Sequence, residues 1–206
     1  LLTLDEKGEG TFKEYVKGFI IDAAVRELQS RHSEQAISHL MVNGSQIDLQ
    51  DYLTIKEGHV TDLDWDAYIR KITRMKAAPA FDSLNMNSPE NEEFGDRDVD
   101  ARHFTEMSFR HSRAEKPLMA DAKLIAAMNP VQFIRNNHPG VCAHWRIRHG
   151  AFDRDTGLAI PVILGTLLKN AGYDADIALP WGLPHCGDYD LDELFAWIDR
   201  LCEENK

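Results

Sequence analysis

The sequence is poor in several features that would assign a function class directly. It has three cysteines, Cys142, Cys186 and Cys202, and no C-x-x-C pair. These are too few and too scattered for a disulfide framework, so we expect free thiols. No apolar run approaches the ~20 residues that a membrane span needs. The formal net charge is −11 and no basic stripe is present. We therefore expect neither a nucleic-acid nor a membrane partner, because nothing would offset the repulsion of phosphates.

Motifs for metals and for a serine nucleophile are also missing. No H-E-x-x-H or H-x-x-x-H occurs. The run Asp96, Asp98 and Asp100 superficially resembles a calcium loop, but Ala101 and Met107 stand where that loop needs Gly and Glu. We expect no metal and no cofactor. The chain has no Gly-x-Ser-x-Gly elbow, so none of its serines is expected to be a hydrolase nucleophile.

Helical signals dominate residues 1–125. Thr11 and Glu14 form a capping box, and apolar residues up to Leu28 recur at helical spacing, which predicts a helix from residue 11. We also expect helices over 33–40, 64–75 and 118–128, and a small hairpin around Asn43-Gly44.

Periodicity disappears from residue 77 to 117. A loop of this length is usually functional or disordered, and its interspersed Phe, Leu and Met residues favour a loop that packs on the protein. We treat 1–125 as one mainly helical domain that contains this loop.

Residues 126–206 have a different pattern. Alternation over 141–148 predicts a strand, 157–171 a helix, 176–179 a second strand, and the apolar stripe from Leu191 to Cys202 a last helix with a buried face. Strand, helix, strand implies parallel strands joined by a right-handed crossover. Parallel sheets need neighbouring strands and cover on both faces, so we expect missing strands to come from elsewhere.

Two polar side chains follow these strands at the position where open α/β sheets carry their functional groups. Asp153 follows the first strand and His185 the second. A buried carboxylate can orient an imidazole, which can then deprotonate a serine. The alternative for Asp153 is a helix-entry cap, and for His185 a turn residue beside Pro184. Acid, crossover helix, strand and histidine loop resemble the closing order of an α/β-hydrolase, whose triad runs Ser, Asp or Glu, then His.

The same region resembles one family of such enzymes. Residues 144–156 (HWRIRHGAFDRDT) and 184–199 (PHCGDYDLDELFAWID) are similar to the C-terminal part of bacterial tannases of the Lactobacillus type. The resemblance spans the whole chain, is strongest over 139–202, and continues in 74–82 (RMKAAPAFD) and 88–95 (SPENEEFG). It implies an α/β fold class, the C-terminal part of an α/β-hydrolase preceded by a mainly helical lid or insertion.

The resemblance also implies roles for particular residues. The triad acid falls on Asp153 and the triad histidine on His185, and Lys76, Glu90 and Asp155 match the residues that hold the gallate hydroxyls. Glu92 is an alternative to Glu90. Carboxylates accept hydrogen bonds from phenolic hydroxyls and a lysine complements them. Taken alone, Lys76 and both glutamates are typical of solvated surface charge.

The expected function is therefore hydrolysis of galloyl or other phenolic esters by a Ser-His-Asp triad. Because the serine belongs to the half of the fold that this chain lacks, we expect the chain alone to be inactive and its partner to be that missing N-terminal half. A feruloyl or other small-ester carboxylesterase is the nearest alternative. A non-catalytic binding remnant is the alternative from another class. With no signal-peptide pattern in view, a cytoplasmic location is favoured.

Overall fold

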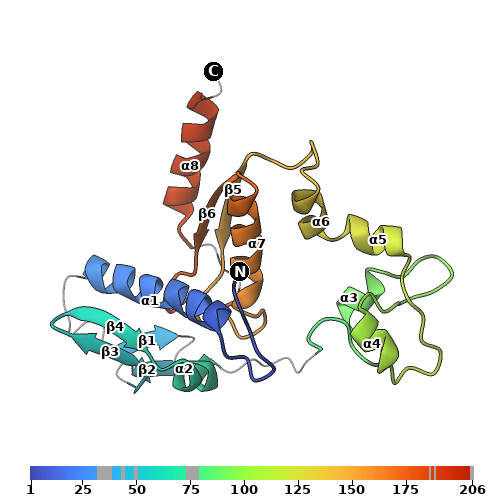
Figure 1. Ribbon diagram of the computed structural model, residues 1–206, viewed down its shortest axis with the longest axis horizontal. Helices are drawn as coiled ribbons and strands as arrows, with labels where there is room; N and C mark the ends of the chain where they lie inside the picture. Colours follow the sequence, from blue (N-terminus) through green and yellow to red (C-terminus); the bar gives the residue numbers. More distant parts are fainter. Residues whose placement is uncertain are drawn as a thin grey trace.

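The structure is a computed structural model that describes residues 1–31, 39–42, 45–48, 51–72, 79–185, 187 and 189–204 (Figure 1). The N-terminal elements are α1 (Thr11–Arg31), β1 (His39–Val42), β2 (Ser45–Asp48), β3 (Leu53–Lys56), β4 (His59–Leu63) and α2 (Trp65–Ile72). The middle holds α3 (Pro89–Glu92), α4 (Glu106–Arg110), α5 (Ala122–Ala127) and α6 (Pro130–Arg135). The C-terminal elements are β5 (His144–Arg148), α7 (Ala159–Asn170), β6 (Asp174–Ala178) and α8 (Leu191–Glu204). No helix among these is both long and apolar enough to cross a lipid bilayer.

The first helix and the first hairpin are confirmed. Strands β1 and β2 pair antiparallel from His39↔Asp48 to Val42↔Ser45, on either side of residues 43–44. The expected helix over 33–40 is wrong at its end, because residues 39–40 belong to β1, whose cross-strand pairing outweighs local helix propensity. The rest of that segment lies outside the described residues.

A second hairpin, β3–β4, was missed by the sequence reasoning. Its turn residues Glu57 and Gly58 have positive φ angles of 50° and 77°. Two-residue hairpin turns with positive φ at both central positions usually carry Asn-Gly or Asp-Gly. Because Glu57 occupies the first position, the usual signal was absent. The described part of residues 1–125 therefore contains two hairpins as well as helices.

The segment from residue 79 to 117 is organised around one buried carboxylate. The Asp82 side chain is 1% exposed and accepts hydrogen bonds from the backbone N–H of Thr105 at 2.7 Å, from Asn91 Nδ2 at 2.8 Å and from His103 Nδ1 at 2.7 Å. Burial alone would raise the pKa of Asp82, but these donors hold it below its ordinary value. The order Asp82, His103, Ser112 resembles a hydrolase triad, with His103 Nε2 2.8 Å from Ser112 Oγ. His103 is fully buried, so this chain of hydrogen bonds is structural.

The C-terminal elements form the expected parallel pair. Strands β5 and β6 run parallel in the register His144↔Asp174 to Arg148↔Ala178, and the crossover helix α7 packs against them. The chain is thus a mixed α/β structure with a small parallel sheet. The described residues do not show a full α/β-hydrolase fold.

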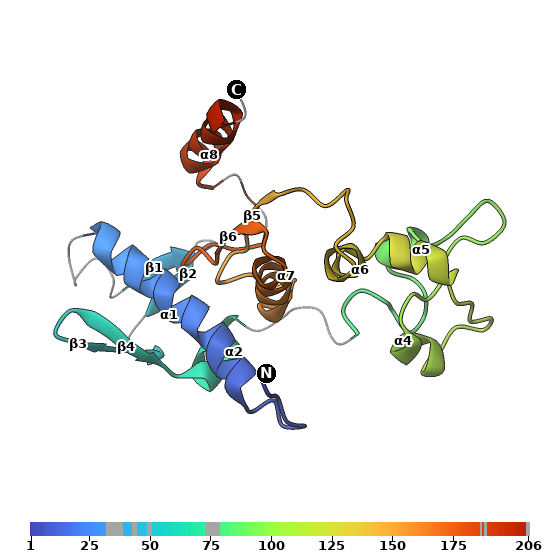
Figure 2. The ribbon, with the colours of Figure 1, turned by 45° about the horizontal axis from the view of Figure 1, so that its top comes forward.

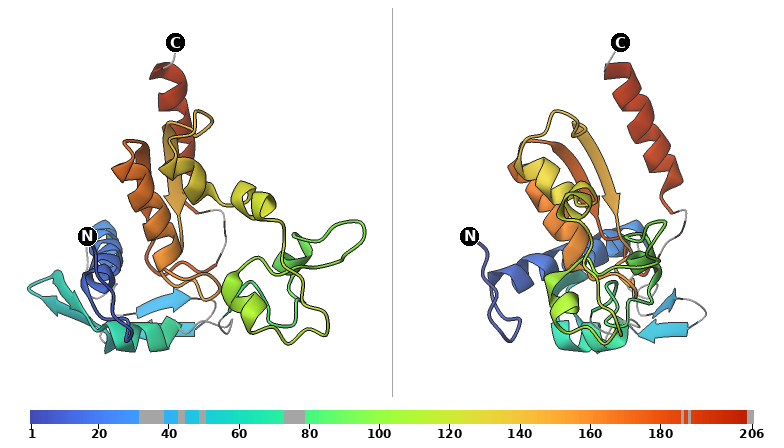
Figure 3. Two further views of the ribbon diagram at one scale, coloured as in Figure 1. Left: turned by 45° about the vertical axis from the view of Figure 1, so that its right-hand side comes forward. Right: turned by 90° about the vertical axis from the view of Figure 1, so that its right-hand side faces the viewer.

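The predicted buried face of the last helix is wrong for this chain. No described residue of α8 is buried, and Phe195 is 59% exposed. Helix α8 projects away from the other elements in Figures 1 and 2 and in the right panel of Figure 3, and no described element packs extensively on it. Leu191, Phe195 and Ile198 of the apolar stripe therefore face solvent, and Leu194 is half-buried.

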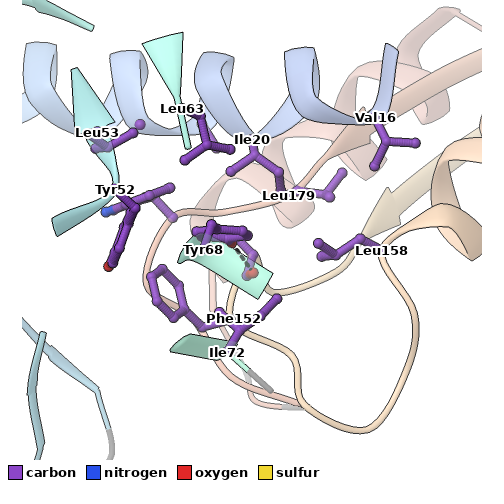
Figure 4. Close-up of a cluster of buried hydrophobic side chains, with 14 of the residues drawn as sticks. Val16, Ile20, Tyr52, Leu53, Leu63, Tyr68, Ile72, Phe152, Leu158 and Leu179 are labelled. Atoms are coloured by element: carbon purple, nitrogen blue, oxygen red, sulfur yellow. Dashed lines mark hydrogen bonds between the residues drawn. The ribbon is translucent and has the colours of Figure 1, made fainter. Parts of the chain in front are cut away.

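One hydrophobic core joins the N-terminal elements to the C-terminal sheet (Figure 4). Ile20 of α1, Leu63 of β4 and Tyr68 of α2 are fully buried against Phe152 and Leu179. The core thus supports the two segments that follow β5 and β6, where the expected site residues lie. The exposed Cys142 and Cys202 are free thiols as predicted, and Cys186 lies outside the described residues.

Candidate active site

Two loops meet at the carboxyl ends of β5 and β6 because parallel strands end at the same sheet edge. Their pairing continues beyond the strands: the N–H of Ala151 donates to Pro180 O at 3.0 Å, and the N–H of Phe152 donates to Leu183 O at 3.0 Å. Gly150 permits this close approach, since a Cβ there would lie 2.2 Å from Leu183 O. The backbone therefore fixes the loop after β5, here called the acid loop (149–156), against the histidine loop (179–190).

Aromatic side chains of the hydrophobic core support the acid loop and the histidine loop. The Tyr68 hydroxyl of α2 donates a hydrogen bond to the carbonyl of Ala151. The Tyr68 and Phe152 rings lie 5.5 Å apart edge-to-face, and Phe152 and Trp181 lie 5.2 Å apart. Such arrangements stabilise beyond their buried area. Arg154 Nε adds a hydrogen bond of 3.0 Å to Ile72 O. The N-terminal elements thus determine where the acid loop sits.

Asp153 and His185 are hydrogen bonded to each other, with His185 Nδ1 3.0 Å from Asp153 Oδ2. The other carboxylate oxygen, Oδ1, accepts the backbone N–H of Asp155 at 2.7 Å and of Thr156 at 2.9 Å. Asp153 is therefore both the turn cap of the alternative interpretation and the partner of an imidazole. It is 4% exposed, whereas 49% of the His185 side chain is exposed, so a reacting group can reach the ring.

The environment keeps Asp153 charged. Burial alone would raise its pKa, but the N–H of Thr156, the His185 ring and the N–H of Asp155 stabilise the carboxylate and hold the pKa below the ordinary value of 3.8. A charged carboxylate on Nδ1 leaves the remaining ring nitrogen of His185 to accept a proton. His185 could therefore act as the base of a nucleophilic site, with Asp153 orienting its ring.

An ion network fixes the far end of the histidine loop. Asp190 Oδ2 lies 2.6 Å from Arg146 Nη2 and 2.7 Å from Arg148 Nε, and Asp176 Oδ2 lies 2.6 Å from Arg148 Nη2. Burial would lower the pKa of Arg148, but the two carboxylates raise it. The same arginines line a cavity of about 530 Å³ together with Asp153 and His185. The catalytic candidates thus face a space that can hold a ligand.

The structure brings one expected substrate-binding residue to this pair. Polar atoms of Asp153, Asp155 and His185 lie within 4.8 Å of one another. They are close enough to share a cation, but His185 Nδ1 already binds Asp153. Lys76 lies outside the described residues. Among the described residues that line the cavity, Glu90 does not occur; it lies on α3 with the exposed alternative Glu92, in the lobe drawn to the side of the sheet (Figures 1 and 2).

A further histidine at the site escaped the sequence reasoning. His149 Nε2 lies 3.2 Å from Asp153 Oδ2, and the ring is 9% exposed. The spacing of four residues between His149 and Asp153 was the available signal. It carries little weight in a loop, where i,i+4 proximity is not guaranteed. In the sequence, Arg146 and Arg148 of β5 appeared only as the polar positions of an alternating strand pattern. Their partner Asp190 is distant in sequence, so the ion pairs could not be predicted.

Comparisons with known proteins place these features in context. No family model and no curated protein matches the chain. Among solved structures, tannin acyl hydrolase from Lactobacillus plantarum is 44% identical with a TM-score of 0.85, covering 98% of this chain and 41% of that one. Fusobacterium nucleatum tannase is 42% identical with a TM-score of 0.81, covering 97% and 40%. Two further matching structures, each 44% identical, are of a tannin acyl hydrolase in complex with 3,4-dihydroxybenzoate and with ethyl gallate. The predicted resemblance is confirmed, and the chain spans about two-fifths of the structures it matches.

Proposed function

Because this chain is tannase-like over 98% of its length, we propose that it is the C-terminal part of a serine esterase that hydrolyses galloyl and related phenolic esters. The observation that carries the proposal is the Asp153–His185 hydrogen bond beside the cavity at the carboxyl ends of β5 and β6. Asp and His in this order and position match the last two members of an α/β-hydrolase triad.

Each group has a role in the proposed mechanism. A serine from the remainder of the enzyme attacks the ester carbonyl carbon while His185 accepts its proton. The imidazolium then gives that proton to the departing alcohol, which leaves an acyl-serine. Water attacks the acyl-serine with His185 again as base, and the acid is released as serine recovers its proton. Asp153 holds Nδ1–H throughout and stabilises the imidazolium.

Substrate selection is assigned to the polar groups near the triad. Asp155, adjacent to both Asp153 and His185, accepts hydrogen bonds from ring hydroxyls of a galloyl group. Lys76 and Glu90, with Glu92 as the alternative to Glu90, complete this set by resemblance. A ring that lacks the hydroxyls would leave buried polar groups unpaired, which disfavours its binding.

The partner of this segment is the remaining part of the same hydrolase. It supplies the serine and covers the apolar stripe of α8, which is exposed in this chain. The two-stranded parallel sheet supports this, because parallel strands are normally flanked by further strands and covered on both faces. The segment alone should show no ester turnover.

A chimera tests the proposal directly. This chain replaces the matching segment of L. plantarum tannase, and kcat/KM is measured on methyl gallate and methyl ferulate. We expect gallate hydrolysis, reduced by about 10⁴-fold in Asp153→Asn and His185→Ala. His144→Ala is the matched control, since His144 and Asp174 form a similar pair, 2.9 Å apart, at the amino ends of the same strands.

The results separate the parts of the proposal. Activity that survives His185→Ala would refute the triad. Undiminished gallate hydrolysis in Asp155→Ala would refute the phenol assignment and leave the esterase standing. Faster turnover of methyl ferulate than of methyl gallate would favour the feruloyl esterase.

A further inference from the structure

His149 sits between two hydrogen-bond acceptors. Its Nδ1 lies 3.0 Å from Gly150 O, and its Nε2 lies 3.2 Å from Asp153 Oδ2. Nε2 is buried and makes no hydrogen bond with any described residue. The ring therefore presents both nitrogens to oxygen atoms that can only accept.

No neutral tautomer satisfies this environment. A neutral imidazole carries one N–H and one lone pair. If the proton is on Nδ1, where it meets Gly150 O, the Nε2 lone pair faces a carboxylate. If it is on Nε2, the Nδ1 lone pair faces a carbonyl. Only the imidazolium could donate to both, whereas burial of the ring opposes its charge, so these two effects compete in setting the protonation of His149.

The proton would act on the same oxygen that His185 uses. Asp153 Oδ2 is 3.0 Å from His185 Nδ1 and 3.2 Å from His149 Nε2. We propose that His149 is a positioning residue of the triad: when neutral it leaves Asp153 Oδ2 to His185, and when protonated it shares that oxygen and weakens His185 as a base. This inference rests on the proposed function.

The surroundings set the pH range of the effect. Burial lowers the pKa of His149 below its ordinary value of 6.5, the charge of Asp153 opposes this, and a proton on His185 reinforces it. Among the described residues, the other charged groups that line the adjoining cavity are Arg146 and Arg148 on β5 and Asp190 on the histidine loop, and these pair with one another. His149 should therefore bind its proton only below pH 6.5.

The first test uses the 206-residue chain itself. Two-bond ¹H–¹⁵N spectra report which imidazole nitrogens carry protons. We expect His149 Nδ1 protonated throughout and Nε2 gaining a proton below pH 6.5, with an inflection of the His185 signals at the same pH. His149→Asn should remove that inflection, and Asp153→Asn should move the His149 titration to lower pH. An Nε2 signal of His149 that stays unprotonated down to acid unfolding would overturn the inference, even if the variants fail to fold.

The second test uses the chimera and its pH profile. If a proton on His149 lowers activity in addition to a proton on the catalytic base, kcat/KM should fall on the acid side by up to about 100-fold per pH unit. In His149→Asn the fall should be about 10-fold, because one proton is then bound in place of two. His144→Ala should keep the steeper profile. The inference would be contradicted if kcat/KM of the unsubstituted chimera fell by only about 10-fold per pH unit and His149→Asn did not change this slope. A chimera without gallate hydrolysis, whose His149 still binds the proton, would refute the proposed function instead.

Discussion

Replacing Gly150 with alanine should separate the two loops that carry Asp153 and His185. Gly150 lies where the acid loop crosses the histidine loop, and an added Cβ would lie 2.2 Å from Leu183 O and 2.3 Å from Pro184 O. Both obstacles are backbone atoms, so no side-chain rotation can relieve them. The loops must move apart.

The size of the movement follows from the contact distances. Ordinary van der Waals contact begins at 3.4 Å, so the nearer oxygen must retreat by about 1.2 Å (3.4 − 2.2). Added to the 3.0 Å between His185 Nδ1 and Asp153 Oδ2, such a shift exceeds hydrogen-bond range. We expect a stability loss of about 1–3 kcal/mol, as for other overpacked sites. Activity of the chimera should fall by about 10²-fold, the usual cost of a 1 Å misplacement.

Urea unfolding of this chain measures the stability, and the imidazole spectra report the His185 Nδ1–H hydrogen bond. Gly18→Ala is the matched control, because a Cβ at Gly18 meets nothing within 4 Å and the residue lies inside α1. It should stabilise the chain by up to about 1 kcal/mol, the difference in helix propensity. A Gly150→Ala chain with unchanged stability and an intact His185–Asp153 hydrogen bond would refute the reasoning.

Three further predictions concern stability. Tyr68→Phe leaves the buried Ala151 carbonyl without its donor and should cost about 1–3 kcal/mol in urea unfolding; no loss would show that the hydroxyl does not brace the acid loop. Asp82→Asn should expose residues 79–117 to limited proteolysis, whereas Asp96→Asn, at an exposed carboxylate, should not; equal cleavage would contradict a polar core. The free energy of unfolding should fall as pH drops below 6.5, because the folded state lowers the pKa of His149 and the unfolded chain binds that proton more readily. It should fall again below pH 3.8, because the folded state lowers the pKa of Asp82 and Asp153 and is stabilised by these carboxylates only while they are charged. A pH-independent unfolding free energy between 7 and 5 would contradict the His149 part.

Some features of this protein were determined by local sequence. The helical spacing after Thr11 specifies α1, although the Thr11 hydroxyl pairs with Thr3 and does not cap the helix, and the strands on either side of Asn43-Gly44 pair as predicted. Alternation around residue 145 and the crossover pattern specify two parallel strands. Parallel strands end at one edge, so positions 153 and 185 were predictable neighbours without coordinates. These inferences worked because each depends on periodicity or on the chemistry of a few adjacent residues.

Other features were decided only by tertiary structure. The core around Asp82 is polar and joins residues 82, 91, 103 and 105, and such a core leaves no hydrophobic period to read. The apolar residues of α8 have the helical spacing of a buried face, yet they are exposed. Their spacing shows that one face of the helix could be covered, but it does not show which element covers it. The position of His149 depends on how the acid loop turns, which the carboxyl-end pairing with Pro180 and Leu183 fixes. The distance between two side chains in a loop without regular structure is set by the fold. The contact of His149 with Asp153 was therefore visible only in the tertiary structure.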